Sequence, residues 1–204
     1  MIRVSDYNHR LYDITKEGEF GKWTLKKTTD KKGTDLYCYT TGRGVIYKDQ
    51  ADKDWKGVEL KNQWGVMMTD NPFEQESYKP AIDFARGKIL VSGLGVGLFN
   101  VLVEDKIKAG VISRLDIVEL SKDLMDWVTQ YIPMMNTRVV VSDIQKYLDE
   151  TDETYDFIFL DIWPGDLAAV LEGPILAEKA KRCLNPNGIV RYWMEGIPPM
   201  MGYV

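Results

Sequence analysis

Residues 88–98 read KILVSGLGVGL, and this stretch decides the fold. It opens with an aliphatic run at 89–91 that is typical of a buried strand. Glycines follow at alternate positions: Gly93, Gly95 and Gly97. Apolar residues at helical spacing come next: Leu98, Val101 and Leu102. A buried strand that ends in a glycine turn and leads into a helix predicts the first unit of an open α/β sheet.

The glycines predict a place where the backbone turns tightly and a ligand approaches the chain. The helix that follows points its free N–H groups, the positive end of its dipole, toward this turn. We therefore expect an anionic group of a ligand there. The alternative is a tight connection between strand and helix with no ligand.

The spacing of the three glycines is G-x-G-x-G, because Leu98 stands where a dinucleotide fingerprint has its third glycine. This pattern resembles motif I of the class I S-adenosylmethionine (SAM)-dependent methyltransferases and of the related spermidine synthases. The resemblance implies a Rossmann-like SAM-methyltransferase fold. It also implies that the methionine carboxylate of the cofactor lies at the helix end, with Gly93, Gly95 and Gly97 holding it.

The chain after residue 70 alternates strand and helix patterns, which predicts a mostly parallel sheet covered on both faces. The expected strands are 89–92, 114–120, 138–142, 157–161 and 189–193. Ser121 is expected to cap a helix with apolar residues up to Tyr131, and a long helix is expected over 166–184. Few residues follow the fifth strand, so we expect a C-terminally shortened sheet. The N-terminal strands or a second subunit, giving a homodimer, would then cover that side.

Residues before 71 predict an N-terminal antiparallel β-meander, because short aromatic and β-branched segments alternate with glycine turns. The expected strands are 11–14, 20–27, 35–40, 44–47 and 64–68. A helix is expected from 72 to about 86, kinked or split at Pro80. We therefore predict two domains, the β-meander at 1–70 and the SAM-binding domain at 71–204.

Three acids stand at the ends of expected strands, where parallel sheets bind ligands. Glu119 is suited to accept hydrogen bonds from vicinal ribose hydroxyls, and its alternative is a solvent-facing acid. Asp161 is suited to stabilise a sulfonium or to act as a base. The resemblance implies that Asp143 accepts the adenine amino group and that Ile144 packs on the ring. The alternative for Asp143 is a helix N-cap.

Within this superfamily the chain most resembles the spermidine synthases, through WGVMMTDNPFEQESY at 64–78 and YDFIFLD at 155–161. This likeness implies that Tyr78 and Asp161 lie at an amine substrate. Three positions depart from the family pattern: Val96 and Pro164 replace acids, and Lys79 replaces a histidine. A polyamine carries several positive charges, so the loss of acids argues against putrescine as the substrate.

The composition sets further expectations. The net charge of −5 gives a nucleic-acid partner no general attraction. Two distant cysteines, Cys38 and Cys183, and no visible signal peptide or membrane span predict a cytoplasmic protein without a membrane partner. With one histidine, we expect no metal.

We expect a SAM-dependent methyltransferase that acts on a small molecule or an exposed side chain. One alternative is an aminopropyltransferase of the spermidine synthase type, which uses decarboxylated SAM. The other is a non-catalytic member of the fold that keeps only a nucleoside or scaffold role.

Overall fold

Five parallel strands form the central sheet of the computed structural model, which describes residues 1–40, 45–163 and 166–195. The strand order is β11-β10-β7-β8-β9. The strands are β7 (Gly87–Ser92), β8 (Ile112–Glu119), β9 (Thr137–Val141), β10 (Tyr155–Leu160) and β11 (Leu184–Tyr192). All four neighbouring pairs are parallel. The predicted α/β class with a parallel sheet is confirmed.

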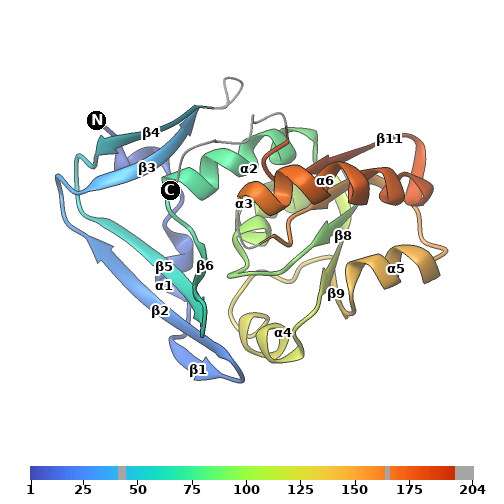
Figure 1. Cartoon of the computed structure of the whole chain (residues 1–204), viewed down its shortest axis with the longest axis horizontal. Helices are drawn as coiled ribbons and strands as arrows, with labels where there is room; N and C mark the ends of the chain where they lie inside the picture. Colours follow the sequence, from blue (N-terminus) through green and yellow to red (C-terminus); the bar gives the residue numbers. More distant parts are fainter. Residues whose placement is uncertain (41–44, 164–165, 196–204) are drawn as a thin grey trace.

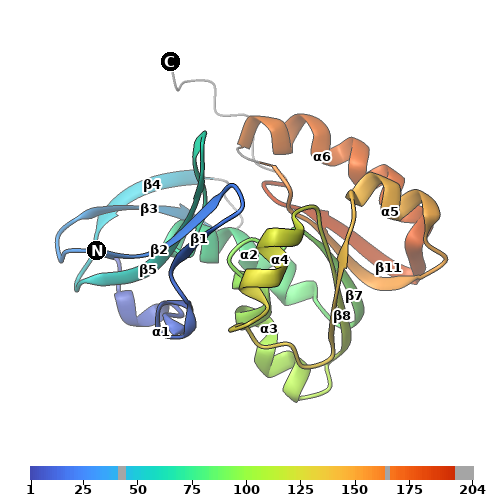
Figure 2. The same cartoon turned by 90° about the horizontal axis from the view of Figure 1, so that it is seen from below.

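Helices cover both faces of this sheet (Figure 2). They are α3 (Leu98–Lys108), α4 (Lys122–Val128), α5 (Ile144–Glu150) and α6 (Asp166–Ala180), the last continued by the 3-10 turn η2 (Lys181–Cys183). Helices α3 and α4 lie on one face, while α5 and α6 lie on the other (Figure 2). The chain runs from β7 through β8 to β9 in one direction along the sheet, and then returns to β10 and continues to β11 in the opposite direction. Because crossovers between parallel strands are right-handed, this reversal of direction places the second pair of helices on the opposite face from the first.

Burial on both faces explains why the central strands are continuous apolar runs rather than alternating ones. Ile89 and Leu90 in β7 are fully buried, as are Phe157 and Ile158 in β10. A strand with this pattern can be recognised from sequence, and each of the five predicted segments overlaps an observed strand.

A second sheet precedes the central one and stands beside it (Figure 1). Its order is β1-β2-β5-β6, all antiparallel. The strands are β1 (Gly18–Phe20), β2 (Trp23–Asp30), β5 (Trp55–Asn62) and β6 (Gly65–Thr69). Strands β3 (Asp35–Thr40) and β4 (Val45–Gln50) form a separate hairpin between β2 and β5. The N-terminal part is therefore not a simple meander, and the division into two domains at residue 70 stays a prediction.

Three N-terminal expectations need correction. Residues 11–14, expected as a strand, belong to the short helix α1 (Arg10–Ile14), which follows the 3-10 turn η1 (Val4–Asp6). Leu11 is the buried residue of α1, so this short helix packs against the core through one apolar side chain. The segment 20–27 is broken by a turn at Gly21, whose φ of 54° ends β1 before β2 begins. Strand β5 was not predicted at all.

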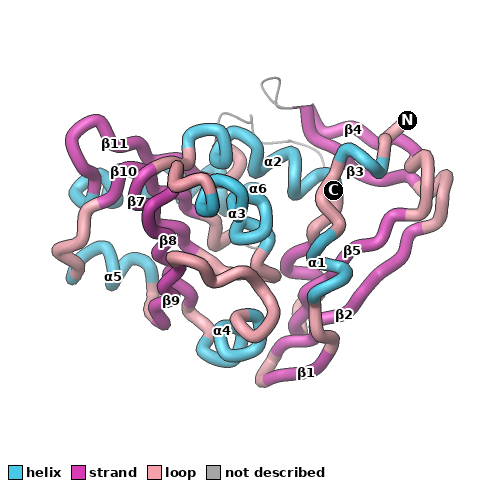
Figure 3. Tube along the Cα trace, turned by 180° about the vertical axis from the view of Figure 1, so that it is seen from behind, coloured by secondary structure: helices cyan, strands magenta, loops and turns pink. Residues whose placement is uncertain are grey.

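Helix α2 (Pro72–Phe84) leads from the N-terminal strands back to the central sheet (Figure 3). Asn71 caps it by accepting a hydrogen bond from the Glu74 N–H at 3.0 Å. Pro80 lies inside the helix and does not split it, contrary to one expectation. The predicted cap at Ser121 is confirmed, since its hydroxyl accepts from the Leu124 N–H at 3.2 Å.

The end of the chain differs from expectation at one further point. Residues 185–188, expected to stop the long helix, lie within β11, where the pairing with β10 shifts register between Tyr155 and Phe157. The helical pattern expected up to Tyr131 ends at Val128. Residues 196–204, on which the expectation of a shortened sheet depends, lie outside the described residues. No described helix has the length and apolar character needed to cross a membrane.

Candidate functional site

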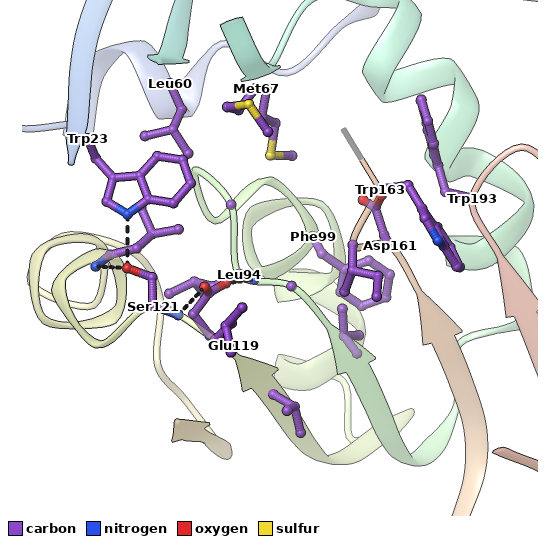
Figure 4. A pocket seen from close by; sticks show the side chains of 18 of the residues that line it. Trp23, Leu60, Met67, Leu94, Phe99, Glu119, Ser121, Asp161, Trp163 and Trp193 are labelled. Carbon is purple, nitrogen blue, oxygen red and sulfur yellow. Dashed lines mark hydrogen bonds between the residues drawn. The ribbon is translucent and has the colours of Figure 1, made fainter. Parts of the chain in front are cut away.

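A cavity of about 750 Å³ lies at the carboxyl ends of β7, β8 and β10. The N-terminal sheet closes its other side, so the cavity lies between the two sheets (Figure 4). Ligands of open α/β folds bind at this edge because the strand ends leave a crevice there. Seven of the eight predicted site residues line it: Tyr78, Gly93, Gly95, Glu119, Asp143, Ile144 and Asp161.

The glycine turn forms the floor of the cavity. Gly93, Gly95 and Gly97 have φ angles of 89°, 52° and 83°, in the left-handed region that favours glycine. The space beside each glycine is filled by protein: the Asp161 carbonyl at Gly93, the Met68 sulfur at Gly95 and the Ile132 side chain at Gly97. The absence of side chains at these positions therefore serves close packing of the chain itself, while Gly93 and Gly95 still line the cavity.

Gly97 differs from the other two glycines. It is not among the described residues that line the cavity, and it faces Ile132 instead. It precedes α3, whose first residue is Leu98. The structure thus assigns Gly97 to the junction of turn and helix, and its predicted ligand contact has no geometric support.

Glu119 lies at the end of β8, and its side chain is held in place by the backbone. One carboxylate oxygen accepts from the Leu94 N–H at 2.9 Å, and the other accepts from the Ser121 N–H at 2.7 Å. The residue is 7% exposed. Since each carboxylate oxygen has a second lone pair, Glu119 can still accept hydrogen bonds from a ligand hydroxyl.

Asp143 has the structural role that was considered as an alternative. It caps α5, and one oxygen accepts from the N–H groups of Gln145 at 2.8 Å and Lys146 at 3.1 Å. It also lines the cavity together with Ile144, which is 4% exposed. The capping leaves its second oxygen available to a ligand, so the two roles are compatible.

Asp161, which is half-buried, and Tyr78, which is buried, form a hydrogen-bonded pair. The Tyr78 hydroxyl donates a hydrogen bond to one Asp161 oxygen, and the Asp161 N–H donates to the Ser92 hydroxyl at 3.1 Å. Burial raises the pKa of Asp161 to about 6, while the hydrogen bond from Tyr78 lowers it. Burial, followed by the charge of Asp161, raises the pKa of Tyr78 well above its usual value. At neutral pH the pair holds a carboxylate beside a neutral phenol.

Aromatic rings surround this carboxylate (Figure 4). The Trp163 N–H donates to Glu172 at 3.1 Å, and the Trp193 N–H donates to Ser77 at 3.0 Å. Because both indole N–H groups are already bonded to protein, these rings offer a ligand only carbon surfaces. Phe99 adds a third apolar ring.

Sequence reasoning missed the wall that the N-terminal sheet contributes. It consists of Trp23, Leu60, Val66, Met67 and Met68. Met68 also accepts a weak hydrogen bond from the Val96 N–H, with 3.4 Å between nitrogen and sulfur. The stretch WGVMM was recognised as a strand, but its spacing carries no signal of what it covers.

The charges of the described lining residues favour a cationic ligand. Five are carboxylates and two are lysines: Glu74, Glu119, Asp123, Asp143 and Asp161, against Lys22 and Lys122. A surplus of carboxylates attracts a cation and repels a pyrophosphate. No group of three or more His, Cys, Asp or Glu side chains in the described part of the chain is placed to hold a metal ion.

Comparison with known proteins gives partial likenesses. No family model matches the chain. It is similar to the polyamine aminopropyltransferase of Escherichia coli O1:K1, with 26% identity over 132 residues, covering 57% of this chain and 43% of the relative. The aminopropyltransferase of Pyrobaculum calidifontis is 26% identical over 116 residues, covering 50% and 39%. The chain thus spans less than half the length of these relatives.

Solved structures that are similar to this chain include methyltransferases. Human methyltransferase-like protein 13 in complex with SAH aligns with a TM-score of 0.40 and 21% identity, covering 56% of each chain. A putative SAM-dependent methyltransferase from Streptococcus mutans aligns with a TM-score of 0.48 and 17% identity, covering 73% of this chain and 44% of that one.

Proposed function

We propose that this protein binds S-adenosylmethionine and transfers its methyl group to a small nucleophile. The observation that carries the proposal is the convergence of a glycine turn, Glu119 and Asp161 on one acid-rich cavity at neighbouring strand ends. The cavity fits this ligand in two respects. Its excess of carboxylates suits a sulfonium cation, and Glu119 offers free lone pairs to a ribose.

The cofactor supplies an electrophilic methyl group when it is bound. Glu119 and the glycine turn hold its nucleoside and amino-acid ends, and the aromatic rings exclude water from the reacting centre. The Asp161 carboxylate accepts the proton that the nucleophile loses, and the Tyr78 hydroxyl fixes the direction of that carboxylate. Most of the acceleration then comes from holding the two reactants in line.

Aminopropyl transfer from decarboxylated SAM is the second candidate. The 26% identity to polyamine aminopropyltransferases supports it, as does the Tyr78–Asp161 pair. The apolar rings beside Asp161 oppose it, because they offer only carbon surfaces to a substrate that carries several positive charges. Val96 supplies no carboxylate at the glycine turn.

A binding panel tests the proposal. Calorimetry with the purified 204-residue chain compares the binding of SAM, S-adenosylhomocysteine, decarboxylated SAM, methylthioadenosine and NAD. A methyltransferase binds S-adenosylhomocysteine more tightly than the decarboxylated compound, and an aminopropyltransferase shows the reverse order. Binding of NAD alone, or of none of the five, would remove both candidates. Normal binding without transfer to any nucleophile would support the non-catalytic alternative.

A further inference from the structure

The N-terminal sheet reaches the cavity through a hydrogen bond that the proposed function does not yet use. The indole N–H of Trp23, on β2, donates to the hydroxyl oxygen of Ser121 at 2.9 Å. These residues are separated by 98 positions in sequence, and both line the cavity (Figure 4). The contact therefore joins the N-terminal sheet to the start of α4, two residues after β8 ends.

The bonding of Ser121 leaves its hydroxyl hydrogen available. A serine oxygen has two acceptor positions and one hydrogen to donate. The two acceptor positions are taken by the Trp23 indole N–H and by the Leu124 N–H at 3.2 Å. Among the described residues, no group accepts the remaining hydrogen. Ser121 is thus a hydrogen-bond donor in the wall of the cavity.

This donor lies next to the Glu119 carboxylate. The backbone N–H of Ser121 donates to one oxygen of Glu119 at 2.7 Å, which fixes the two side chains relative to each other. Glu119 accepts hydrogen bonds, and Ser121 donates one. A sugar hydroxyl both donates and accepts, so one pair of neighbouring hydroxyls satisfies both residues.

We propose that Ser121 is a binding residue that donates its hydroxyl hydrogen to a ribose hydroxyl of the nucleoside. Trp23 is then a positioning residue that fills one acceptor position of Ser121 and so directs the hydrogen into the cavity. The N-terminal sheet becomes part of the nucleoside site. This inference rests on the proposed function, since it concerns the ribose of the same ligand.

A purely structural role for Ser121 predicts different behaviour. Ser121 caps α4, so its loss lowers stability whether or not it binds a ligand. Stability alone cannot separate the two roles. The test must compare a ligand that has ribose hydroxyls with one that lacks them.

Calorimetry with S-adenosylhomocysteine and its 2′,3′-dideoxy analogue makes this comparison. We expect Ser121→Ala to weaken binding of S-adenosylhomocysteine about tenfold, the usual effect of losing one hydrogen bond, and to leave binding of the dideoxy analogue unchanged. Ser121→Thr keeps the hydroxyl and should retain the affinity. Trp23→Phe keeps an aromatic ring but loses the indole N–H. This variant should bind S-adenosylhomocysteine about threefold more weakly.

Trp127 provides a matched control. Its indole N–H, on α4, donates to the Lys16 carbonyl at 2.9 Å, and its ring stacks on Phe20. It joins the same two parts of the chain but is not among the described residues that line the cavity. Trp127→Phe should therefore lower stability, as Trp23→Phe does, and leave both affinities unchanged.

Three outcomes would decide against the inference. Equal losses for both ligands in Ser121→Ala would assign the serine to capping alone. If Trp23→Phe and Trp127→Phe bound S-adenosylhomocysteine with equal affinity, Trp23 would have no positioning role. In both cases the proposed function stands, because the wild-type protein still binds S-adenosylhomocysteine. Failure of the wild-type protein to bind either compound would overturn the proposed function and this inference with it.

Discussion

The hydroxyl of Tyr78 donates a hydrogen bond to the carboxylate of Asp161, which joins α2 to the end of β10. Both side chains line the cavity, where Tyr78 is buried and Asp161 is half-buried. Burial raises the pKa of Asp161 to about 6 and the hydrogen bond opposes this rise, so the carboxylate is charged at neutral pH. It is therefore well placed to take a proton near physiological pH.

Replacement of Asp161 tests its role as the base. We expect Asp161→Asn to lower the rate of transfer at least about 100-fold, because the amide cannot accept the proton. Binding of S-adenosylhomocysteine should stay within about twofold, since Glu119 and the glycine turn are intact. Steady-state kinetics and calorimetry measure the two effects. Asp123→Asn, at an exposed carboxylate of the same cavity, is the control, and full turnover in Asp161→Asn would contradict the assignment.

The pH profile gives a second prediction for the same pair. The rate should rise with pH and reach half its maximum near pH 6, because the charged form of Asp161 is the active one. In Tyr78→Phe the hydrogen bond that lowers the pKa of Asp161 is lost, so the midpoint should move to higher pH. A profile with an unchanged midpoint in this variant would show that Tyr78 does not act on the carboxylate.

Asp70 is a buried acid at the junction of β6 and α2. One oxygen accepts from the Val58 N–H at 2.8 Å, and the other has no partner among the described residues. Burial raises the pKa of Asp70 to about 7, against 3.8 for its ordinary value. The folded protein therefore binds this proton more tightly than the unfolded chain does. Between these two pH values, the contribution of Asp70 to the free energy of unfolding falls as pH rises.

Asp70→Asn should remove this dependence. At pH 8 we expect the variant to be more stable than the wild type, on the order of 2 kcal/mol, because the amide carries no charge to bury. At pH 4 the two proteins should be equally stable, since Asp70 is then neutral. Urea denaturation at both values measures the difference. A variant that is less stable at pH 8 would indicate an unrecognised partner for the free oxygen.

The fit between Gly95 and Met68 gives a fourth prediction. Gly95→Ala places a Cβ against the Met68 sulfur and at a φ of 52°, so we expect a loss of about 2–4 kcal/mol in stability. Gly33→Ala is the control, because Gly33 also has a positive φ but no atom within 4 Å of an added Cβ. It should cost about 1 kcal/mol. Gly95→Ala combined with Met68→Ala should cost less than the sum of the single changes.

Asp116 is the centre of a charged network away from the cavity. It is fully buried and accepts from Arg114 at 2.8 and 2.9 Å, from Arg138 at 3.2 and 2.7 Å and from the Tyr155 hydroxyl at 2.9 Å. Asp116→Ala leaves these donors without their acceptor, and we expect it to cost about 3 kcal/mol. Glu153→Gln, at the exposed edge of the network, should cost less than about 1 kcal/mol.

Chemical denaturation and ligand binding together test this network. None of its residues is among the described residues that line the cavity, so nucleoside affinity should be unchanged in both variants. Loss of affinity in Asp116→Ala at a temperature where the protein is fully folded would show that the network shapes the site.

The central sheet was predictable because its strands are buried on both faces, and short continuous apolar runs such as 89–91, followed by glycine, are typical of such strands. Strand β5 was missed because Gly57 and its charged neighbours look like a turn. In the structure Gly57 lies against Asp70 and the Trp55 indole, where a side chain would not fit. Helix α1 gives no helical signal in the sequence, because one helical turn is too short to show a period.

The acids of the site were predictable for a different reason. Glu119, Asp143 and Asp161 each follow a recognisable strand, and parallel strands end at one edge of their sheet. Tyr78 was found only through resemblance to a family. Trp23 and Met68 were not found, because their position depends on how two sheets pack, which no local pattern encodes.

The tryptophans around the cavity give the protein a built-in optical signal. Trp23, Trp163 and Trp193, half of the six in the chain, line it. A nucleoside that enters the cavity displaces water from these rings, and indole emission responds to the polarity of its surroundings. Occupancy of the site can therefore be followed by intrinsic fluorescence, without a label and without knowledge of the acceptor.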